Sequence, residues 1–236
     1  MAKGNFKQKL YRFFIKVLIV FLIITVIPVI VYRFVPPPIT PLMIIRYYQN
    51  QNNGNEAKIE KQWISFERIS SNTTLAAISA EDQRFTEHFG FDFDAISKAY
   101  EHNTSGYSGK VVGGSTISQQ VAKNVFLVPN RSFIRKGFEA YFTVLIEVFW
   151  SKKRIMEVYL NVIEMGDGIY GIEAASQKYF NKPARELTKS ESAAIMAIVP
   201  NPRKFSVLNP APNTLRYKNA IIRHMREVSN RKLYRH

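Results

Sequence analysis

The longest uninterrupted apolar stretch of the chain lies near its N-terminus. Residues 17–32 carry no charge, and apolar neighbours extend the stretch to residues 13–35. About 20 such residues span a bilayer as a helix, and Lys16 and Arg33 are placed to reach the two interfaces. A cleaved signal peptide has a shorter apolar stretch and a small-residue cleavage site, which Tyr32–Pro38 does not offer. The pattern therefore predicts an uncleaved transmembrane anchor.

The polar pattern on either side of this stretch predicts its orientation and its exit. Five Lys or Arg residues and no acid lie up to Lys16, so residues 1–12 are expected to form a cytoplasmic basic tail of a single-pass protein. Residues 36–58 are expected to form a proline-rich, membrane-proximal linker. Within it, Leu42–Tyr48 is apolar again and suits either a shallow membrane contact or a core helix, and Gln49–Asn55 is a polar break.

The remaining residues, 59–236, have mainly helical periodicity and few strand signals, so we expect one mainly α domain. Apolar residues recur at helical spacing, and plausible caps and prolines mark several ends. The expected helices are one capped by Asn72 and running to Phe85, then Phe133–Trp150, Lys152–Val162, Thr188–Val199 and Arg216–Val228.

Composition narrows the class of protein. The hydrophobic fraction of 46% supports a real core, and the absence of cysteine excludes disulfides and cysteine-built metal sites. The net charge is +15, from 33 Lys and Arg against 18 Asp and Glu. Without the five N-terminal cations the balance is still 33 − 5 − 18 = +10. Such a charge indicates an anionic partner: nucleic acid, a membrane surface or a phosphorylated substrate.

The first segment with candidate chemistry is Glu81–Asp92. Glu81 and Asp82 end a run of small apolar residues, where the helix dipole disfavours negative charge. A buried glutamate beside a second acid has a raised pKa, which suits a general base. The same residues also suit a solvated acidic turn. His88 is expected to hydrogen-bond the turn at Gly90 rather than to act as base or ligand.

The second segment is Gly113–Asn124. Its Gly-Gly turn and a cap at Ser115 or Thr116 begin a helix whose free N–H groups suit an anion. Spacings of three, four, seven and eight residues place one polar stripe on a single helical face. The stripe carries one cation and suits sugar hydroxyls and phosphate; it consists of Thr116, Gln120, Lys123 and Asn124.

Two further segments carry paired polar residues. Arg135 and Glu139 are one turn apart, with Lys136 adjacent, at the start of an otherwise apolar helix. The pattern suits either an i,i+4 surface ion pair or charges that face a cleft. Glu157 and Asn161 are also one turn apart. They are expected to brace the site or to cap nearby backbone.

These four segments, in this order, resemble the motifs of the peptidoglycan glycosyltransferase family, which also forms a domain of bifunctional penicillin-binding proteins. The matching residues are Glu81, Asp82, Phe85, His88 and Gly90; Gly113, Ser115, Thr116, Ile117, Ser118, Gln119, Gln120 and Lys123; Arg135, Lys136 and Glu139; and Ile155, Glu157, Tyr159, Leu160, Asn161, Gly166 and Gly171. The resemblance covers roughly residues 60–215, and the short remainder predicts a monofunctional member.

The resemblance implies a lysozyme-like helical domain with a smaller, membrane-proximal hydrophobic lobe, on the outer side of the bacterial inner membrane. It implies lipid II as acceptor and a lipid-linked glycan strand as donor, with the bilayer and penicillin-binding transpeptidases as partners. Glu81 would be the catalytic base, and Glu139 would orient cations or bind a divalent Mg or Mn ion at the diphosphate. The substrate-binding residues would be Asp82, Thr116, Gln120, Lys123, Asn124, Arg135 and Lys136.

Two other functions compete with this interpretation. A lysozyme-like enzyme that cleaves peptidoglycan shares an essential glutamate, but it does not need the Lys123, Arg135 and Lys136 cluster. A non-enzymatic nucleic-acid binder would show a known motif or basic residues interleaved with exposed aromatics, and we find neither, so no nucleic acid is expected.

The glycine-bearing stretch Glu101–Val112 has few apolar residues and is expected to be a mobile flap over the bound glycan.

Overall fold

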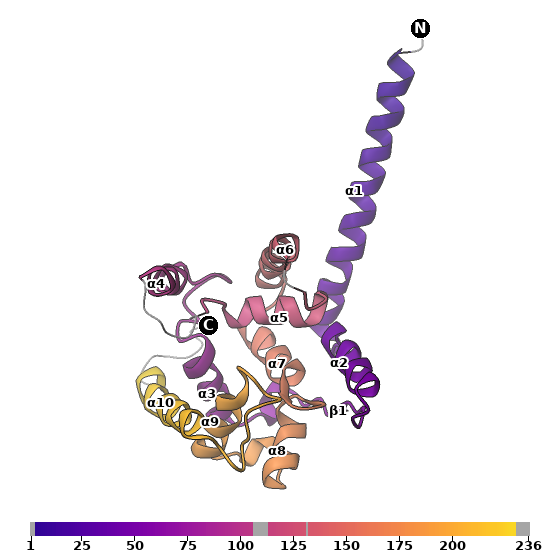
Figure 1. Ribbon diagram of the computed structural model, residues 1–236. Coiled ribbons are helices and arrows are strands. Elements are labelled where there is room, and N and C mark those ends of the chain that lie inside the picture. Colours follow the sequence, from indigo (N-terminus) through magenta and orange to yellow (C-terminus); the bar gives the residue numbers. More distant parts are fainter. Residues whose placement is uncertain (1–2, 106–112, 131, 230–236) are drawn as a thin grey trace. The chain divides into compact units, whose positions relative to one another are not determined.

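The computed structural model describes residues 3–105, 113–130 and 132–229 (Figure 1). The chain divides into two compact units, residues 1–36 and residues 37–236. The prediction of a mainly helical protein is confirmed, since helices make up most of the described chain and the strands are short.

The first unit consists of helix α1, Lys3–Phe34. Its 28 residues from Lys7 to Phe34 form the one helix in the described ranges that is long and apolar enough to cross a membrane. At 1.5 Å per residue it is about 40 Å long, more than the ~30 Å hydrocarbon core of a bilayer. The helix starts before the expected anchor at residues 13–35, so the basic tail continues the same helix. These properties are compatible with a single-pass membrane anchor.

The second unit contains nine of the described α-helices around a small sheet. They are α2 Pro41–Asn52, α3 Ser71–Glu81, α4 Phe93–Thr104, α5 Ile117–Phe126, α6 Phe133–Phe149, α7 Lys152–Val162, α8 Ile172–Phe180, α9 Lys189–Ile198 and α10 Pro212–Ser229. Short 3-10 turns lie at Phe66–Arg68 and Ala184–Glu186. The strands β1 Glu60–Lys61, β2 Glu164–Gly166 and β3 Ile169–Tyr170 pair in the order β1-β3-β2, with β1 parallel and β2 antiparallel to β3.

Helix α2 belongs to the second unit, although the segment was expected to be a linker. Met43 is buried and the helix packs against α5, whereas Ile44 and Tyr48 on the same helix are exposed. Residues 49–52 of the expected polar break are instead the last turn of the helix, because the Asn50 side chain is buried and donates to Asp167 at 3.0 Å, and residues 53–55 follow the helix as expected. One face of α2 therefore packs into the core, and the other face is exposed.

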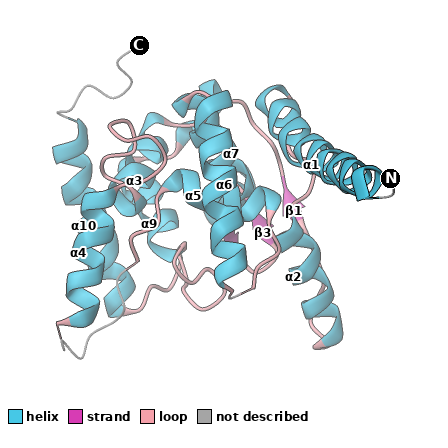
Figure 2. Ribbon diagram, turned by 90° about the horizontal axis from the view of Figure 1, so that it is seen from above, coloured by secondary structure: helices cyan, strands magenta, loops and turns pink. Residues whose placement is uncertain are grey.

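The core that positions the site is made by two groups of helices (Figure 2). Helix α3 packs against α9 and α10, and α5 packs against α6 and α7. Small side chains such as Ala76, Ala77 and Ala193 are fully buried, which lets α3 and α9 approach closely. Asn161 of α7 bonds both backbone groups of Ile64, in the segment after β1, at 2.9 Å each. This supports the expected bracing role of Asn161.

The helix boundaries agree with the sequence at some ends and differ at others. Helix α7 has the predicted bounds, and Thr188 caps α9 as expected. The expected Asn72 cap is wrong: Ser70 caps α3, because the Asn72 amide side chain instead donates to the Leu187 carbonyl at 3.1 Å. Helix α3 also ends at Glu81 rather than at Phe85.

The start of the expected flap is ordered as helix. Helix α4 continues to Thr104, so residues 101–104 form its last turn instead of a loop. Residues 106–112, which make up the rest of the expected flap, lie outside the described residues.

Candidate active site

Glu81 is the last residue of α3, a helix whose small residues from Thr73 to Ser79 are all buried. Its Oε2 atom accepts a hydrogen bond from Gln120 Nε2 at 2.8 Å. Its Oε1 atom is buried and has no hydrogen-bond partner among the described residues. Burial raises the pKa of Glu81, Asp82 adds to the increase, and Gln120 and Lys123 oppose it. A buried carboxylate with one oxygen unsatisfied is suited to accept a proton.

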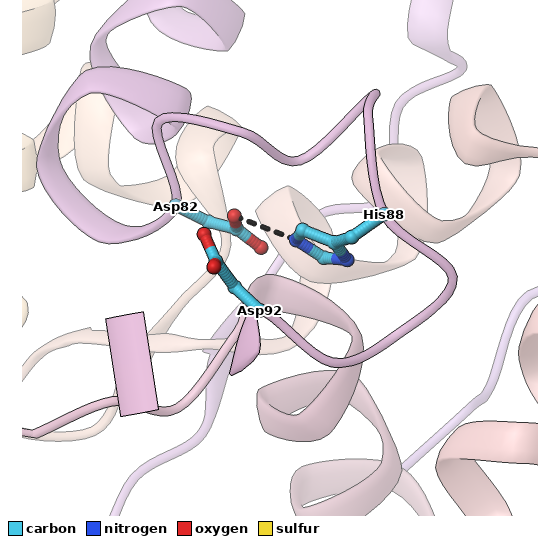
Figure 3. A group of neighbouring side chains, drawn as sticks. All are labelled: Asp82, His88 and Asp92. Carbon is cyan, nitrogen blue, oxygen red and sulfur yellow. Dashed lines mark hydrogen bonds and ion pairs between the residues drawn. The ribbon is translucent and has the colours of Figure 1, made fainter. Parts of the chain in front are cut away.

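Asp82 joins the end of α3 to the start of α5, and Figure 3 shows its contact with His88. Its Oδ1 atom lies 2.9 Å from His88 Nε2, and its Oδ2 atom accepts from the backbone N–H of Ile117 at 3.0 Å. The side chain is 1% exposed. This carboxylate therefore positions the helix that carries Gln120, a role different from the expected substrate binding. The expected bond of His88 to the Gly90 turn is replaced by the bond to Asp82.

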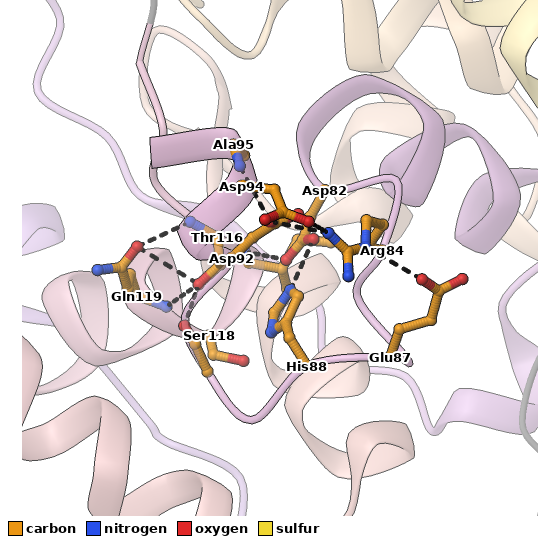
Figure 4. A network of polar contacts seen from close by, with 12 residues as sticks. Asp82, Arg84, Glu87, His88, Asp92, Asp94, Ala95, Thr116, Ser118 and Gln119 are labelled. Carbon is orange, nitrogen blue, oxygen red and sulfur yellow. Dashed lines mark hydrogen bonds and ion pairs between the residues drawn. The ribbon is translucent and has the colours of Figure 1, made fainter. Parts of the chain in front are cut away.

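Thr116 also forms hydrogen bonds within the protein. Its hydroxyl donates to the Gly90 carbonyl at 2.7 Å, and with Gln119 it forms a capping box at the start of α5 (Figure 4). The cap itself is as predicted, with Thr116 and not Ser115 as the capping residue. Thr116 is 2% exposed and fixes the start of the helix, and it also belongs to the lining of the smaller cavity described below.

A group of ligand atoms that could hold a metal ion lies beside the site. Atoms of Asp82, His88 and Asp92 are within 4.8 Å of one another. Asp92 already accepts from the Ala95 N–H at 3.0 Å as the cap of α4, and Arg84 lies 3.5 Å from the same oxygen (Figure 4). The hydrogen bonds of Asp82 and Asp92 and the neighbouring guanidinium of Arg84 satisfy these carboxylates without a metal ion.

Lys123 of α5 lies one turn beyond Gln120, on the same side of the helix. Burial lowers the pKa of Lys123, while Glu139 and Glu81 raise it and Arg135 lowers it. These mutual influences place Lys123 among the charges of α6. Asn124, predicted to share this face, is half-buried and does not line the cavity described below.

The first two turns of α6 carry Arg135 and Lys136, the other two cations of the expected cluster. Arg135 donates to Glu139 Oε2 at 2.6 Å, and Lys136 donates to Glu139 Oε1. The Glu139 side chain is 4% exposed, whereas half of the Lys136 side chain is exposed. Both Glu139 oxygens bond cations, and this geometry fits the orienting role.

Two cavities meet at Glu81. The larger, about 710 Å³, also contains Gln120, Lys123, Phe205 and Tyr217 in its lining. The smaller, about 390 Å³, is lined on its charged side by Arg84, Asp92, Asp94 and Lys98. The carboxylate thus lies at the border of two spaces, one of which contains the buried lysine.

Comparison with known proteins identifies the family of the chain. A family model described as "Transglycosylase" matches residues 49–226, most of the chain. The chain belongs to the transglycosylase family. It is 52% identical over 208 residues to a "Biosynthetic peptidoglycan transglycosylase" of Caulobacter vibrioides, covering 88% of this chain and 87% of the relative. Proteins of the same name from Bdellovibrio bacteriovorus and Bacteroides thetaiotaomicron are 47% and 48% identical, over 95% and 94% of this chain and 86% and 88% of theirs.

In this transglycosylase the site also contains residues that the sequence motifs did not indicate. Phe205 and Tyr217 line the larger cavity but lie after the last motif. Tyr217 belongs to α10, which the sequence indicated only as an amphipathic, basic helix. The one available signal was its apolar face, which predicts packing but does not identify the partner helix.

Proposed function

We propose that this transglycosylase polymerises lipid II into linear peptidoglycan strands. The observation that carries the proposal is the position of Glu81, a buried carboxylate between two cavities, with Lys123 lining one of them. A polymerase of this kind needs two glycan sites that meet at one base. We assign the donor to the larger cavity, because a diphosphate-linked glycan needs the cation there.

The reaction is an inverting glycosyl transfer. Glu81 removes the proton from the 4-hydroxyl of lipid II, and that oxygen attacks the anomeric carbon of the donor glycan. The bond from this carbon to the diphosphate breaks, the polyprenyl diphosphate leaves with the electron pair, and the α linkage becomes β. The proton remains on Glu81 until solvent removes it. No acid is needed for a diphosphate leaving group.

The cation cluster acts on the leaving group. Lys123, Arg135 and Lys136 supply positive charge where the negative charge of the diphosphate develops. Glu139, which bonds both α6 cations, fixes their direction. A divalent Mg or Mn ion bound to the diphosphate oxygens would add further positive charge, and an assay with and without a chelator measures that contribution.

The membrane is the place where both substrates are found. We propose that α1 anchors the chain in the bacterial cytoplasmic membrane with its N-terminus inside, because basic residues precede the apolar stretch. Helix α6 exposes Phe133 and Ile134, at 98% and 76%, next to its cations, as expected of a surface that contacts lipid. A reporter active only in the cytoplasm should be silent when fused after His236; an active reporter would overturn this topology. Penicillin-binding transpeptidases are the expected partners that cross-link the product.

The alternative is cleavage of the same glycan. A hydrolase requires a second group to protonate a sugar leaving group, and it has no use for three cations beside the base. Incubation of the detergent-solubilised full chain with lipid II separates the two functions. Lengthening glycan strands support polymerisation, and shortening of preformed strands supports cleavage.

A further inference from the structure

Helix α10 contacts the chain on both sides of Glu81. The Tyr217 hydroxyl donates to the backbone carbonyl of Ala80 at 2.9 Å. Seven residues later, His224 Nδ1 lies 3.1 Å from Gln83 Nε2. Residues seven apart lie on one face of a helix, so a single face of α10 contacts the residue before the base and the second residue after it.

The Tyr217 hydroxyl binds at the C-terminal end of α3. The last carbonyl groups of an α-helix lack partners within the helix, and Ala80 is the penultimate residue of α3. A donor at this carbonyl fixes the last turn of the helix, and with it the direction of the next side chain. Tyr217 also lines the larger cavity together with Glu81.

We propose that Tyr217 is a positioning residue for the base, acting through the Ala80 carbonyl; this inference rests on the proposed function of Glu81. It predicts that the hydroxyl of Tyr217 controls the rate of proton removal rather than the affinity for substrate. His224 supplies the second, more exposed contact of the same brace.

The charges around Glu81 determine the direction of the expected pH effect. Lys123 from α5 lowers the pKa of Glu81 and Asp82 raises it. Tyr159 of α7 and Tyr217 are neutral phenols whose own pKa values are raised, by burial first and also by Glu81. Without the Tyr217 hydroxyl, the partial negative charge on the Ala80 carbonyl oxygen, one residue before the base, is no longer offset by a donor. The pKa of Glu81 should then rise further.

The test compares two tyrosines that make the same kind of bond. Tyr179 donates to the Met165 carbonyl at 2.8 Å, is half-buried like Tyr217 and does not line the cavity of Glu81. We expect Tyr217→Phe to lower kcat for lipid II about tenfold with KM unchanged, and to move the acid limb of the pH profile to higher pH. Tyr179→Phe should lose similar thermal stability and change neither kcat nor the pH profile.

Each outcome of this comparison either supports or contradicts the positioning role of Tyr217. Equal kinetics of the two variants, or a rise in KM alone for Tyr217→Phe, would overturn the positioning role. If Tyr217→Phe does not fold, His224→Ala is the second variant: a smaller loss of kcat with the same direction of pH shift supports the brace, and an unchanged profile contradicts it. A wild-type protein that makes no polymer refutes the proposed function itself, which is a separate result.

Discussion

The Gln120 amide donates to Glu81 Oε2 at 2.8 Å, across the interface between α5 and α3. This bond joins the first two motifs through two residues that are 39 positions apart. It holds one carboxylate oxygen in place and leaves the other for a proton. Because it stabilises the charged form, it opposes the effect of burial on the pKa of Glu81.

Removing this bond should shift the pH dependence of activity. In Gln120→Leu the pKa of Glu81 rises further, so the base becomes protonated at a higher pH. Activity should therefore be lost earlier as the pH falls, and it should partly recover at alkaline pH. The matched control is Gln177→Leu, since Gln177 donates to Glu173 within α8 at 3.1 Å. Rate profiles of both variants against pH provide the measurement; identical acid limbs would contradict the role of Gln120.

The cation cluster predicts a defect in the use of donor. Lys123→Ala and Arg135→Ala should each lower kcat/KM for the diphosphate-linked donor by about 10²–10³, the usual effect of removing one charge-stabilising group. The matched control is Lys153→Ala, which removes an exposed ion pair with Glu67. Steady-state kinetics with varied donor measure the effect, and unchanged donor kinetics in both cluster variants would exclude the diphosphate role.

Substitution of Asp82 should lower the stability of the protein as well as its activity, unlike substitution of Glu81. Asp82→Ala removes the acceptor of the Ile117 N–H and the partner of His88, both at buried positions. We expect a loss of about 2–3 kcal/mol in the free energy of unfolding, together with a loss of activity. Chemical denaturation and the lipid II assay measure the two effects. Full stability with lost activity would instead indicate that Asp82 contacts substrate.

Local features of the site could be predicted from the sequence because they depend on residues close along the chain. The Thr116 cap, the bounds of α7 and the bond from Arg135 to Glu139 follow from spacings of three or four residues. The end of α3 at Glu81 was only partly predicted, because the run of small apolar residues stops there but the helix was expected to continue to Phe85.

Other features depend on contacts between distant segments. Tyr217 and Ala80 are 137 residues apart, and no local pattern indicates that they meet. Asn50 lies in a run of polar residues that suggests a loop, yet Asp167, 117 residues away, accepts from its side chain and helps to extend α2. Tertiary contacts override local propensity in such cases.

The central claim is that Glu81 is the base of a glycan polymerase. Glu81→Gln has nearly the same size and removes only the charge, so the fold should remain intact. The most direct measurement is the polymerisation of lipid II by the wild-type protein and by Glu81→Gln, with thermal unfolding of both as the control. The account predicts long glycan strands from the wild type and no polymer from the equally stable variant. A variant that keeps more than about one tenth of the wild-type rate, equivalent to ~1.4 kcal/mol, would contradict it.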